Sequence, residues 1–293
     1  MSLTLTHIQQ QLSQHVQASE FRTPLGSLGV FHSRHTHTLR QIPIHMPTMV
    51  LVVNGTKTVY QNHKTLAIQR GDLLLTPGNC ILDISNHPAA SGDYFALALG
   101  FSSQAITQFT ETYAAQLASW KQSLLWQAQA PDMLCDVLEQ WVAWCMQKTM
   151  NPMLALHRQV EILLILAQHQ VAGNLLIERH ASWKQRIVQL FYMDISRDWQ
   201  LVDICPQLGV SESTLRRHLQ TENTGFRELL EEARLLAGLS LLQETFWPIQ
   251  QIAQQVGYQS QSRFAERFKK RFDITPSELR RTRMSDSGKQ LTV

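Results

Sequence analysis

Residues Pro248 to Arg281 read PIQQIAQQVGYQSQSRFAERFKKRFDITPSELRR, and this stretch decides how the rest of the chain is interpreted. Its first apolar residues recur at the spacing of one helix face: Ile249, Ile252, Ala253 and Val256. We expect Gly257 to end this helix and Ser260 to cap a second one. In the second helix, aromatic residues repeat every four positions at Phe264, Phe268 and Phe272. Two short helices joined by a glycine turn, the second strongly basic, predict a helix-turn-helix.

The same pattern occurs a second time, upstream. The leading helix of this copy carries its apolar residues at Leu201, Ile204, Cys205 and Leu208. A glycine, a serine cap and a leucine stripe follow in the same order: Gly209, Ser211, Leu215 and Leu219. Between the copies, residues 226–245 predict a long helix that holds the two modules rigidly apart. Two modules on one connector can address successive major-groove faces, about 34 Å apart along the duplex.

Residues 184–283 resemble the DNA-binding domain of the AraC/XylS family of bacterial transcription regulators. The resemblance is carried by Gly225-Phe226, Arg234, Ala237, Leu241-Leu242, Ile252-Ala253, Val256-Gly257-Tyr258, Ser260, Phe264, Phe268-Lys269, Thr275-Pro276-Ser277 and Arg280. Two positions depart from the family pattern. Asp273 stands where the family usually has glycine, a site that Asp tolerates because it adopts the left-handed conformation more easily than most residues. Pro206 lies inside the leading helix of the first module, so we expect a kink in that helix.

The resemblance implies a sequence-specific transcription regulator, and on family grounds an activator that contacts RNA polymerase. We expect the first turns of the two second helices to enter the major groove and contact base edges. The predicted base contacts are Gln261, Ser262, Arg263, Glu266 and Arg267 in the second module and Ser213, Arg216 and Arg217 in the first. The predicted phosphate contacts are Lys269, Lys270 and His218, which would add affinity without sequence information.

Composition and charge agree with double-stranded DNA as the partner. The net charge is +3, but residues 260–283 hold 8 basic and 3 acidic side chains, which concentrates the positive field at the second module. No stretch of 18 apolar residues occurs, so we expect a cytoplasmic protein with no membrane partner. The four cysteines show no zinc-like spacing. Neither a metal nor another cofactor is expected.

The first hundred residues predict β structure. Met49–Val53 is a β-branched run, Asn54-Gly55 is a hairpin signal, and Thr56–Tyr60 is the expected partner strand. Turns at 62–63, 71–72 and 77–78 separate further short strands, a spacing typical of an antiparallel jelly roll or barrel. This half resembles the cupin-like sensor domain of AraC-type regulators. The fold class is therefore α+β multidomain: an antiparallel β-barrel or cupin-like domain with helices, then an all-α domain of two helix-turn-helix modules joined by a long helix.

Helical periodicity begins near residue 103. Segments 103–117, 131–147 and 153–170 carry apolar residues at helix spacing, and the family resemblance favours homodimerisation through them. An intramolecular core is the competing interpretation for any single helix. We predict a cupin-like sensing and dimerisation domain at 1–172, a linker at 173–183, the DNA-binding domain at 184–284 and a disordered tail at 285–293.

A small-molecule effector is expected in the N-terminal domain, with Phe31, Tyr60, Tyr94 and Phe95 as pocket residues, although the same aromatics suit an ordinary core. Three other hypotheses stay open. His35-Thr36-His37 has the spacing of a cupin metal motif, which would make the chain a metal-dependent enzyme with a DNA-binding module. However, no Asp or Glu occurs between Glu20 and Asp72 to complete such a site. The chain could also be a ligand-independent silencing or architectural protein, or its N-terminal half could bind a protein partner.

Overall fold

The computed structural model describes residues 2–18, 28–61, 64–90, 92–120, 122–147, 151–177 and 182–283. The contacts divide the chain into two compact units. Unit 1 comprises residues 1–177, 243–246 and 279–293, and unit 2 comprises residues 178–242 and 247–278. The predicted tail at 285–293, the turn at 62–63 and residues 178–181 of the predicted linker lie outside the described residues.

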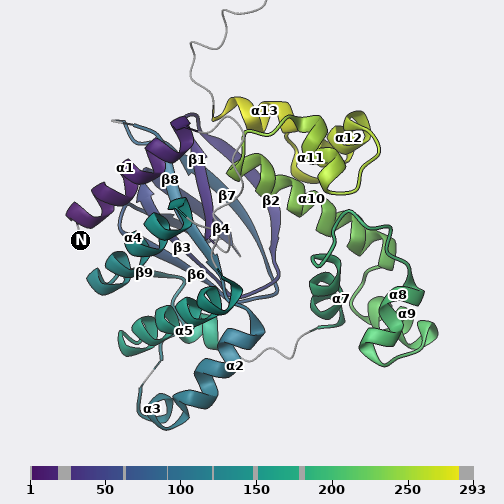
Figure 1. Ribbon diagram of the computed structural model, residues 1–293, viewed down its shortest axis with the longest axis horizontal. Coiled ribbons are helices and arrows are strands. Elements are labelled where there is room, and N and C mark those ends of the chain that lie inside the picture. The colour runs from purple at the N-terminus through teal and green to yellow at the C-terminus, as the bar shows by residue number, and fades with distance from the viewer. Residues whose placement is uncertain are drawn as a thin grey trace, which may run out of the picture. The chain divides into compact units, whose positions relative to one another are not determined.

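Unit 1 is built on two antiparallel sheets (Figure 1). The strands are β1 Leu28–Ser33, β2 His37–Ile44, β3 Thr48–Asn54, β4 Thr56–Gln61, β5 Lys64–Ile68, β6 Asp72–Thr76, β7 Cys80–His87, β8 Tyr94–Gly100 and β9 Gln127–Gln129. The first sheet has the order β1-β8-β3-β6-β9, and the second has the order β2-β7-β4-β5. Apart from the added β9, this is the strand order of a jelly roll, in which consecutive strands enter opposite sheets except for the hairpin of β4 and β5. The predicted antiparallel, cupin-like fold is confirmed, with two facing sheets in place of one continuous barrel.

The expected hairpin at Asn54-Gly55 is wrong. β3 pairs with β6 and β8, whereas β4 pairs with β5 and β7, so the turn carries the chain from one sheet to the other. Gly55 does adopt the left-handed conformation, with φ of +82°, and a β-carbon there would lie 2.4 Å from the carbonyl oxygen of His87. The Asn-Gly signal therefore predicted the turn conformation correctly but not the pairing of the strands that flank it.

Side chains alternate between the two faces of the first sheet along each strand, and both faces are buried. Between the two sheets lie the apolar side chains Val50, Val52, Val59, Ile68, Leu74, Leu82, Tyr94 and Ala96. The other face of the first sheet contributes Met49, Leu51, Val53, Leu73, Leu75, Phe95, Leu97 and Leu99 to a second core with the helices of this unit. Double burial explains the nearly continuous apolar runs of β3 and β8, which differ from the alternation of a sheet with one solvated face.

The helices of unit 1 cover that second face (Figure 1). They are α1 Ser2–Ala18, α2 Ser103–Thr112, α3 Ala114–Ser119, α4 Asp132–Gln147, α5 Pro152–Gln168 and α6 Gly173–Leu176. The helix expected over 103–117 is interrupted at Tyr113, whose φ of −112° and ψ of 22° are not helical. Trp141 of α4 is fully buried in the helix-covered core, so this part of the long apolar helix serves the interior of unit 1.

Unit 2 is helical and contains both predicted helix-turn-helix modules. Its helices are α7 Trp183–Phe191, α8 Leu201–Leu208, α9 Glu212–Thr221, α11 Ile249–Gln255 and α12 Gln261–Phe272, together with most of α10 Phe226–Glu244. A final short helix, α13, spans Pro276–Arg281. Among the described residues, none of the helices combines the length and apolar character needed to span a bilayer. The two modules are α8–α9 and α11–α12, with α10 as the connector, as the sequence repeat predicted.

Candidate nucleic-acid interface

The two helix-turn-helix modules use the same local chemistry. The turn between the helices is left-handed at a glycine in both, with φ of +65° at Gly209 and +83° at Gly257. A serine then caps the second helix: the Oγ of Ser211 accepts from the backbone N–H of Thr214 at 3.3 Å, and the Oγ of Ser260 accepts from that of Arg263, also at 3.3 Å. Because the turn and the cap fix where the second helix begins, they also fix which side chains its first turn presents.

The second module has an aromatic interior. Phe264, Phe268 and Phe272 are fully buried, and their successive ring centroids are 5.4 and 4.6 Å apart. Gly238 of the connector leaves room for the Phe264 ring, because a β-carbon at this position would lie 2.7 Å from that ring. Asp273 ends α12 in the left-handed conformation with φ of +61°, as expected for the residue that replaces the usual glycine. The stripe therefore fixes the rotation of α12 about its axis.

That rotation exposes most of the side chains predicted to contact DNA in the second module. Gln261, Ser262, Arg263 and Glu266 are exposed, and so are Lys269 and Lys270 at the C-terminal end of α12. The first three follow directly after the cap, in the turn that would enter the groove. Their position and exposure fit base contact and those of the lysines fit phosphate contact, but both assignments stay predictions.

Arg267 and Arg271 are held by the connector instead of projecting freely. The Nε of Arg267 lies 3.2 Å from Oε1 of Glu231, and an Nη of Arg271 lies 3.0 Å from Oε1 of Glu232. Both carboxylates belong to α10, so each pair ties the second helix of the module to the connector. Arg267 would have to leave Glu231 before it could contact a base. The structure thus adds a clamping contact to a residue that the sequence assigned to base contact alone.

In the first module, the predicted contacts Ser213, Arg216 and Arg217 are all exposed on α9. Arg216 pairs with Glu212 at 3.4 Å, and Ser213 Oγ lies 3.0 Å from the Oγ of the cap Ser211. His218 is half-buried, and its ring stacks on Trp183 with centroids 4.3 Å apart and planes 13° apart. One face of the imidazole is therefore occupied by α7, and its role as a phosphate contact stays a prediction.

Pro206 lies inside α8, which nevertheless remains helical from Leu201 to Leu208. Proline cannot donate to the carbonyl four residues earlier, which belongs to Val202. Both Pro206 and Val202 are exposed, with Val202 at 66% of its surface, so solvent can hydrate that carbonyl. The first module thus accommodates this proline on the exposed side of α8. Base contact by the first module stays a prediction.

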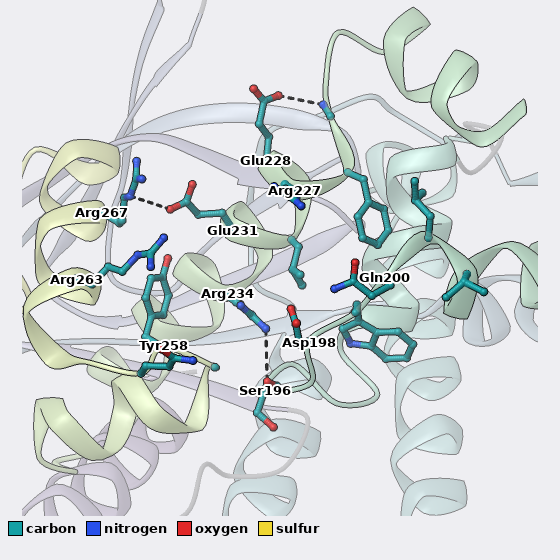
Figure 2. A pocket seen from close by; sticks show the side chains of 18 of the residues that line it. Ser196, Asp198, Gln200, Arg227, Glu228, Glu231, Arg234, Tyr258, Arg263 and Arg267 are labelled. Atoms are coloured by element: carbon teal, nitrogen blue, oxygen red, sulfur yellow. Dashed lines mark hydrogen bonds and ion pairs between the residues drawn. The ribbon is translucent and has the colours of Figure 1, made fainter. Parts of the chain in front are cut away.

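A cleft of about 1700 Å³ separates the two modules, with α10 along its floor (Figure 2). Its charged lining residues are Asp198, Glu212, Arg216, Arg227, Glu228, Glu231, Arg234, Arg263 and Arg267. Figure 2 shows Arg263 beside Tyr258 and the pair of Arg267 and Glu231 on one side of the cleft. Burial, with a smaller contribution from Glu231, raises the pKa of Tyr258 to about 12, so its phenol stays neutral.

Sequence reasoning missed the role of the connector's polar residues. The run Glu231-Glu232-Ala233-Arg234 reads as a solvated helix face, but all three of its charged side chains contact other elements. Glu231 and Glu232 pair with α12, and Arg234 packs on the turn at Gly257. From the sequence, Arg234 contributes only to the family resemblance. Glu222 was also missed: its two carboxylate oxygens accept from the backbone N–H groups of Trp183 and Lys184 at 2.8 and 3.0 Å, which caps α7. The available signal was charge complementarity, because α10 carries the acids Glu231 and Glu232 and α12 is strongly basic.

The four predicted effector residues do not lie in one pocket. Phe31 and Tyr94 face the space between the sheets, whereas Phe95, the next residue along β8, points to the opposite face and stacks on His32 with centroids 4.7 Å apart. Tyr60 is 42% exposed. The structure does not bring Tyr94 and Phe95 together, because neighbouring residues of a strand point to opposite faces.

Phe31 and Tyr94 instead flank a buried amine, Lys57. Its Nζ lies 5.6 and 5.5 Å from their ring centroids and donates to Oδ1 of Asn86 at 2.6 Å. The Nδ2 of Asn86 lies 3.3 Å from Nε2 of His37. Burial lowers the pKa of Lys57 to about 7 and that of His37 to about 4. The buried hydroxyl of Tyr94 has no hydrogen-bond partner among the residues that the structure describes.

The histidine motif does not have the expected strand geometry. β2 begins at His37, so His35 lies in the bend before it, and the two rings differ in burial: His35 is exposed and His37 is buried. Within the described ranges there is no group of three or more histidine, cysteine or acidic side chains that could hold a metal ion. His37 is committed to the buried hydrogen-bonding network with Asn86, which differs from a ligand presented at a strand edge.

Both halves of the chain are similar to known protein domains. A family model described as a helix-turn-helix domain matches residues 204–282, and one described as the ExsA N-terminal regulatory domain matches residues 47–177. The matched helix-turn-helix domain is of the AraC type, and homologues of the chain are AraC/XylS-family activators. The transcriptional activator CfaD of Escherichia coli is 30% identical over 110 residues, which cover 38% of this chain and 42% of CfaD. The urease operon transcriptional activator of the same species is 34% identical over 96 residues, 33% of this chain and 32% of that one.

These AraC/XylS relatives are thus matched over about a third to two fifths of their own length. The transcriptional activator AggR of Escherichia coli matches over more, with 21% identity across 82% of this chain and 92% of AggR. Among solved structures, ToxT from Vibrio cholerae bound to (E)-4-(8-methylnaphthalen-1-yl)but-3-enoic acid covers 88% of this chain and 98% of its own, with 19% identity and a TM-score of 0.59. At that identity the likeness shows the shared fold.

Proposed function

We propose that this chain is a sequence-specific transcription regulator, an activator, whose activity is modulated through its N-terminal domain. One observation supports it above others: two modules with the same left-handed glycine turn and serine cap expose the first turns of their second helices, at Ser213 and at Gln261–Arg263. A connector common to both modules is the arrangement expected of a protein that contacts two successive major grooves. Relatives named as transcriptional activators support the same conclusion.

Selection of bound DNA from a random pool by the full-length protein, followed by sequencing, tests this function. We expect one motif with two elements about one helical turn, or about 34 Å, apart. A motif with one sharp element would assign the module containing Pro206 to backbone contact. Equal binding of many sequences, with a steep dependence on salt, would instead support the silencing or architectural hypothesis.

The effector of this regulator is proposed to be a small molecule with an acidic group and an apolar body. The solved ToxT structures include one bound to an unsaturated fatty acid and one bound to an aryl butenoic acid. In the present chain, the amine of Lys57 between Phe31 and Tyr94 offers a cation surrounded by apolar side chains, and the Tyr94 hydroxyl offers an unused donor. A carboxylate would satisfy both polar groups.

A thermal-shift titration with an unsaturated fatty acid tests the effector, with its methyl ester as the matched control. Stabilisation by the acid alone, which Lys57→Met removes, would support the proposal. A shift from neither compound, together with capture of a defined protein by the N-terminal domain, would favour the protein-partner hypothesis.

Homodimerisation through the helices between residues 103 and 170 and contact with RNA polymerase complete the proposed function. Exposed apolar side chains on α4 and α5 support the dimer: Trp144 is 46% exposed and Met153 is 74% exposed. Analytical ultracentrifugation of the wild type and of Trp144→Glu tests it, with a shift from dimer to monomer expected. In-vitro transcription from a selected site tests activation. The metal-enzyme alternative has no support from the relatives, which are named as transcription regulators.

A further inference from the structure

Arg234 lies on the connector helix α10 and lines the cleft between the two helix-turn-helix modules (Figure 2). Its guanidinium donates to three consecutive backbone carbonyls of the segment that precedes the first module. The Nε donates to Ile195 at 3.3 Å, and an Nη donates to Ser196 at 3.4 Å and to Arg197 at 2.8 Å. A planar guanidinium can satisfy several acceptors from one fixed position, which a lysine amine cannot do with the same geometry.

The segment that receives these bonds is itself firmly held. Trp199 Nε1 donates to the carbonyl of Asp194 at 2.8 Å, and Arg197 pairs with Asp203 of α8 at 2.6 Å. Arg197 also lies over the ring of Trp199, with 4.5 Å between the guanidinium carbon and the ring centroid. Arg234 is therefore bonded to a segment that is anchored on α8 of the first module and cannot easily rotate to follow it.

The same guanidinium packs directly on the turn of the second module. A β-carbon at Gly257 would lie 2.8 Å from both Cζ and Nε of Arg234, which is closer than real side-chain contacts allow. Gly257 thus serves two purposes: it adopts the left-handed turn, and it leaves room for the arginine. Figure 2 shows Arg234 between Tyr258, which follows that turn, and Ser196.

We propose that Arg234 sets the rotational phase between the two recognition helices and therefore the spacing of the two DNA elements that the protein accepts. The inference rests on the proposed function. Leu229, Leu230 and Ala233 pack α10 into the core of the first module, and Gly238 seats it against Phe264 of the second. Apolar packing alone resists rotation of a module about the connector weakly, and the ion pairs of Glu231 and Glu232 restrain only α12. Arg234 acts toward both modules, through directional bonds to the segment that precedes the first and through close packing on the turn of the second. It is a positioning residue that contacts no base.

The test uses the full-length protein and a selected two-element site whose spacer is lengthened or shortened by one or two base pairs. For the wild type we expect a change of one base pair to weaken binding at least tenfold. For Arg234→Met, which keeps most of the side-chain length but removes every donor, we expect the penalty to fall below threefold. Affinity for a site with only one element intact should stay within twofold of the wild type. Arg227→Met, at an exposed arginine of the same helix and the same cleft, is the matched control for lost charge and should keep the full penalty.

A second measurement needs no DNA. Spin labels carried by an unnatural amino acid at the exposed positions Ser213 and Ser262 report the distance between the two recognition helices. The distribution should broaden in Arg234→Met and remain narrow in Arg227→Met. If Arg234→Met fails to fold, Arg234→Lys takes its place, with an intermediate loss of spacing preference expected.

An unchanged spacing penalty together with an unchanged distance distribution in a folded Arg234 variant would overturn the inference. If the wild type selected no two-element site, the proposed function would fail instead. A distribution that broadened in that case would still show that Arg234 fixes the two modules relative to each other.

Discussion

The buried lysine of the N-terminal unit makes the stability of that unit depend on pH. Lys57 is 2% exposed, and burial lowers its pKa to about 7, from about 10.4 for a solvated lysine. Between these pH values the unfolded chain binds the proton and the folded chain does not, so the free energy of unfolding rises with pH. At about 1.4 kcal/mol for each pH unit, keeping the protonated amine inside costs about 5 kcal/mol below pH 7. The contacts with Phe31 and Tyr94 offset part of this cost.

Lys57→Met removes the titration and leaves Oδ1 of Asn86 without its donor at 2.6 Å, a penalty of about 1–3 kcal/mol that does not depend on pH. We therefore expect the variant to be more stable than the wild type near pH 6, and this advantage to fall by about 3 kcal/mol by pH 9. Pulse proteolysis in urea, with fragments assigned by mass spectrometry to β4 and β7, measures the difference at each pH. Arg40→Met, at an exposed position of the same sheet, is the control. A difference between Lys57→Met and wild type that does not change with pH would refute the reasoning.

Three further predictions concern unit 2. Arg263→Ala should relax sequence preference at one position of the selected site. Lys270→Ala should weaken binding to all sequences and lower by about one the slope of log affinity against log salt concentration. Equal effects of both variants in a binding titration over several salt concentrations would contradict both roles. Asp273→Gly should raise the free energy of unfolding by roughly 0.5–1 kcal/mol in urea denaturation, because the φ of +61° costs glycine no strain, and a loss of stability would disagree with this. Gly238→Ala should cost about 1–3 kcal/mol in the same assay, because its β-carbon would lie 2.7 Å from the Phe264 ring, and an alanine tolerated without cost would show that the ring can move.

The sequence predicted the helical unit well, because its information is local. Turn glycines, serine caps and apolar stripes lie within a few residues of one another, so Gly257, Ser260 and Phe264 each indicate the same module. The exposure of Gln261 to Arg263 follows from that pattern by helix geometry alone. Contacts between side chains of different helices could not be predicted from this local pattern. The pairing of Arg267 with Glu231, for example, depends on how α12 packs on α10.

The β domain was harder to predict for the same reason. Short strands and turns indicated an antiparallel sheet, but the order of strands within sheets is set by contacts between residues far apart in the chain. Tyr60 and Tyr94 show the effect: both are aromatic residues of predicted strands, yet the first is 42% exposed and the second is completely buried. The buried position of Lys57 had no local signal at all, because its neighbours on β4 also include polar residues.

The double burial of the first sheet has a consequence for how the N-terminal domain could transmit a signal. Its strands form a partition with separate interiors on its two sides: the space between the sheets, with Val50 and Tyr94, and the helix-covered core, with Met49 and Phe95. A molecule held in the first interior touches no side chain of the second. Its binding could affect the second interior only by displacing the strand backbones. The strands β1, β8, β3 and β6 are hydrogen-bonded side by side, so they would move together. Effector binding would then reach the helices as one collective shift of a sheet and would not pass along a chain of individual side chains.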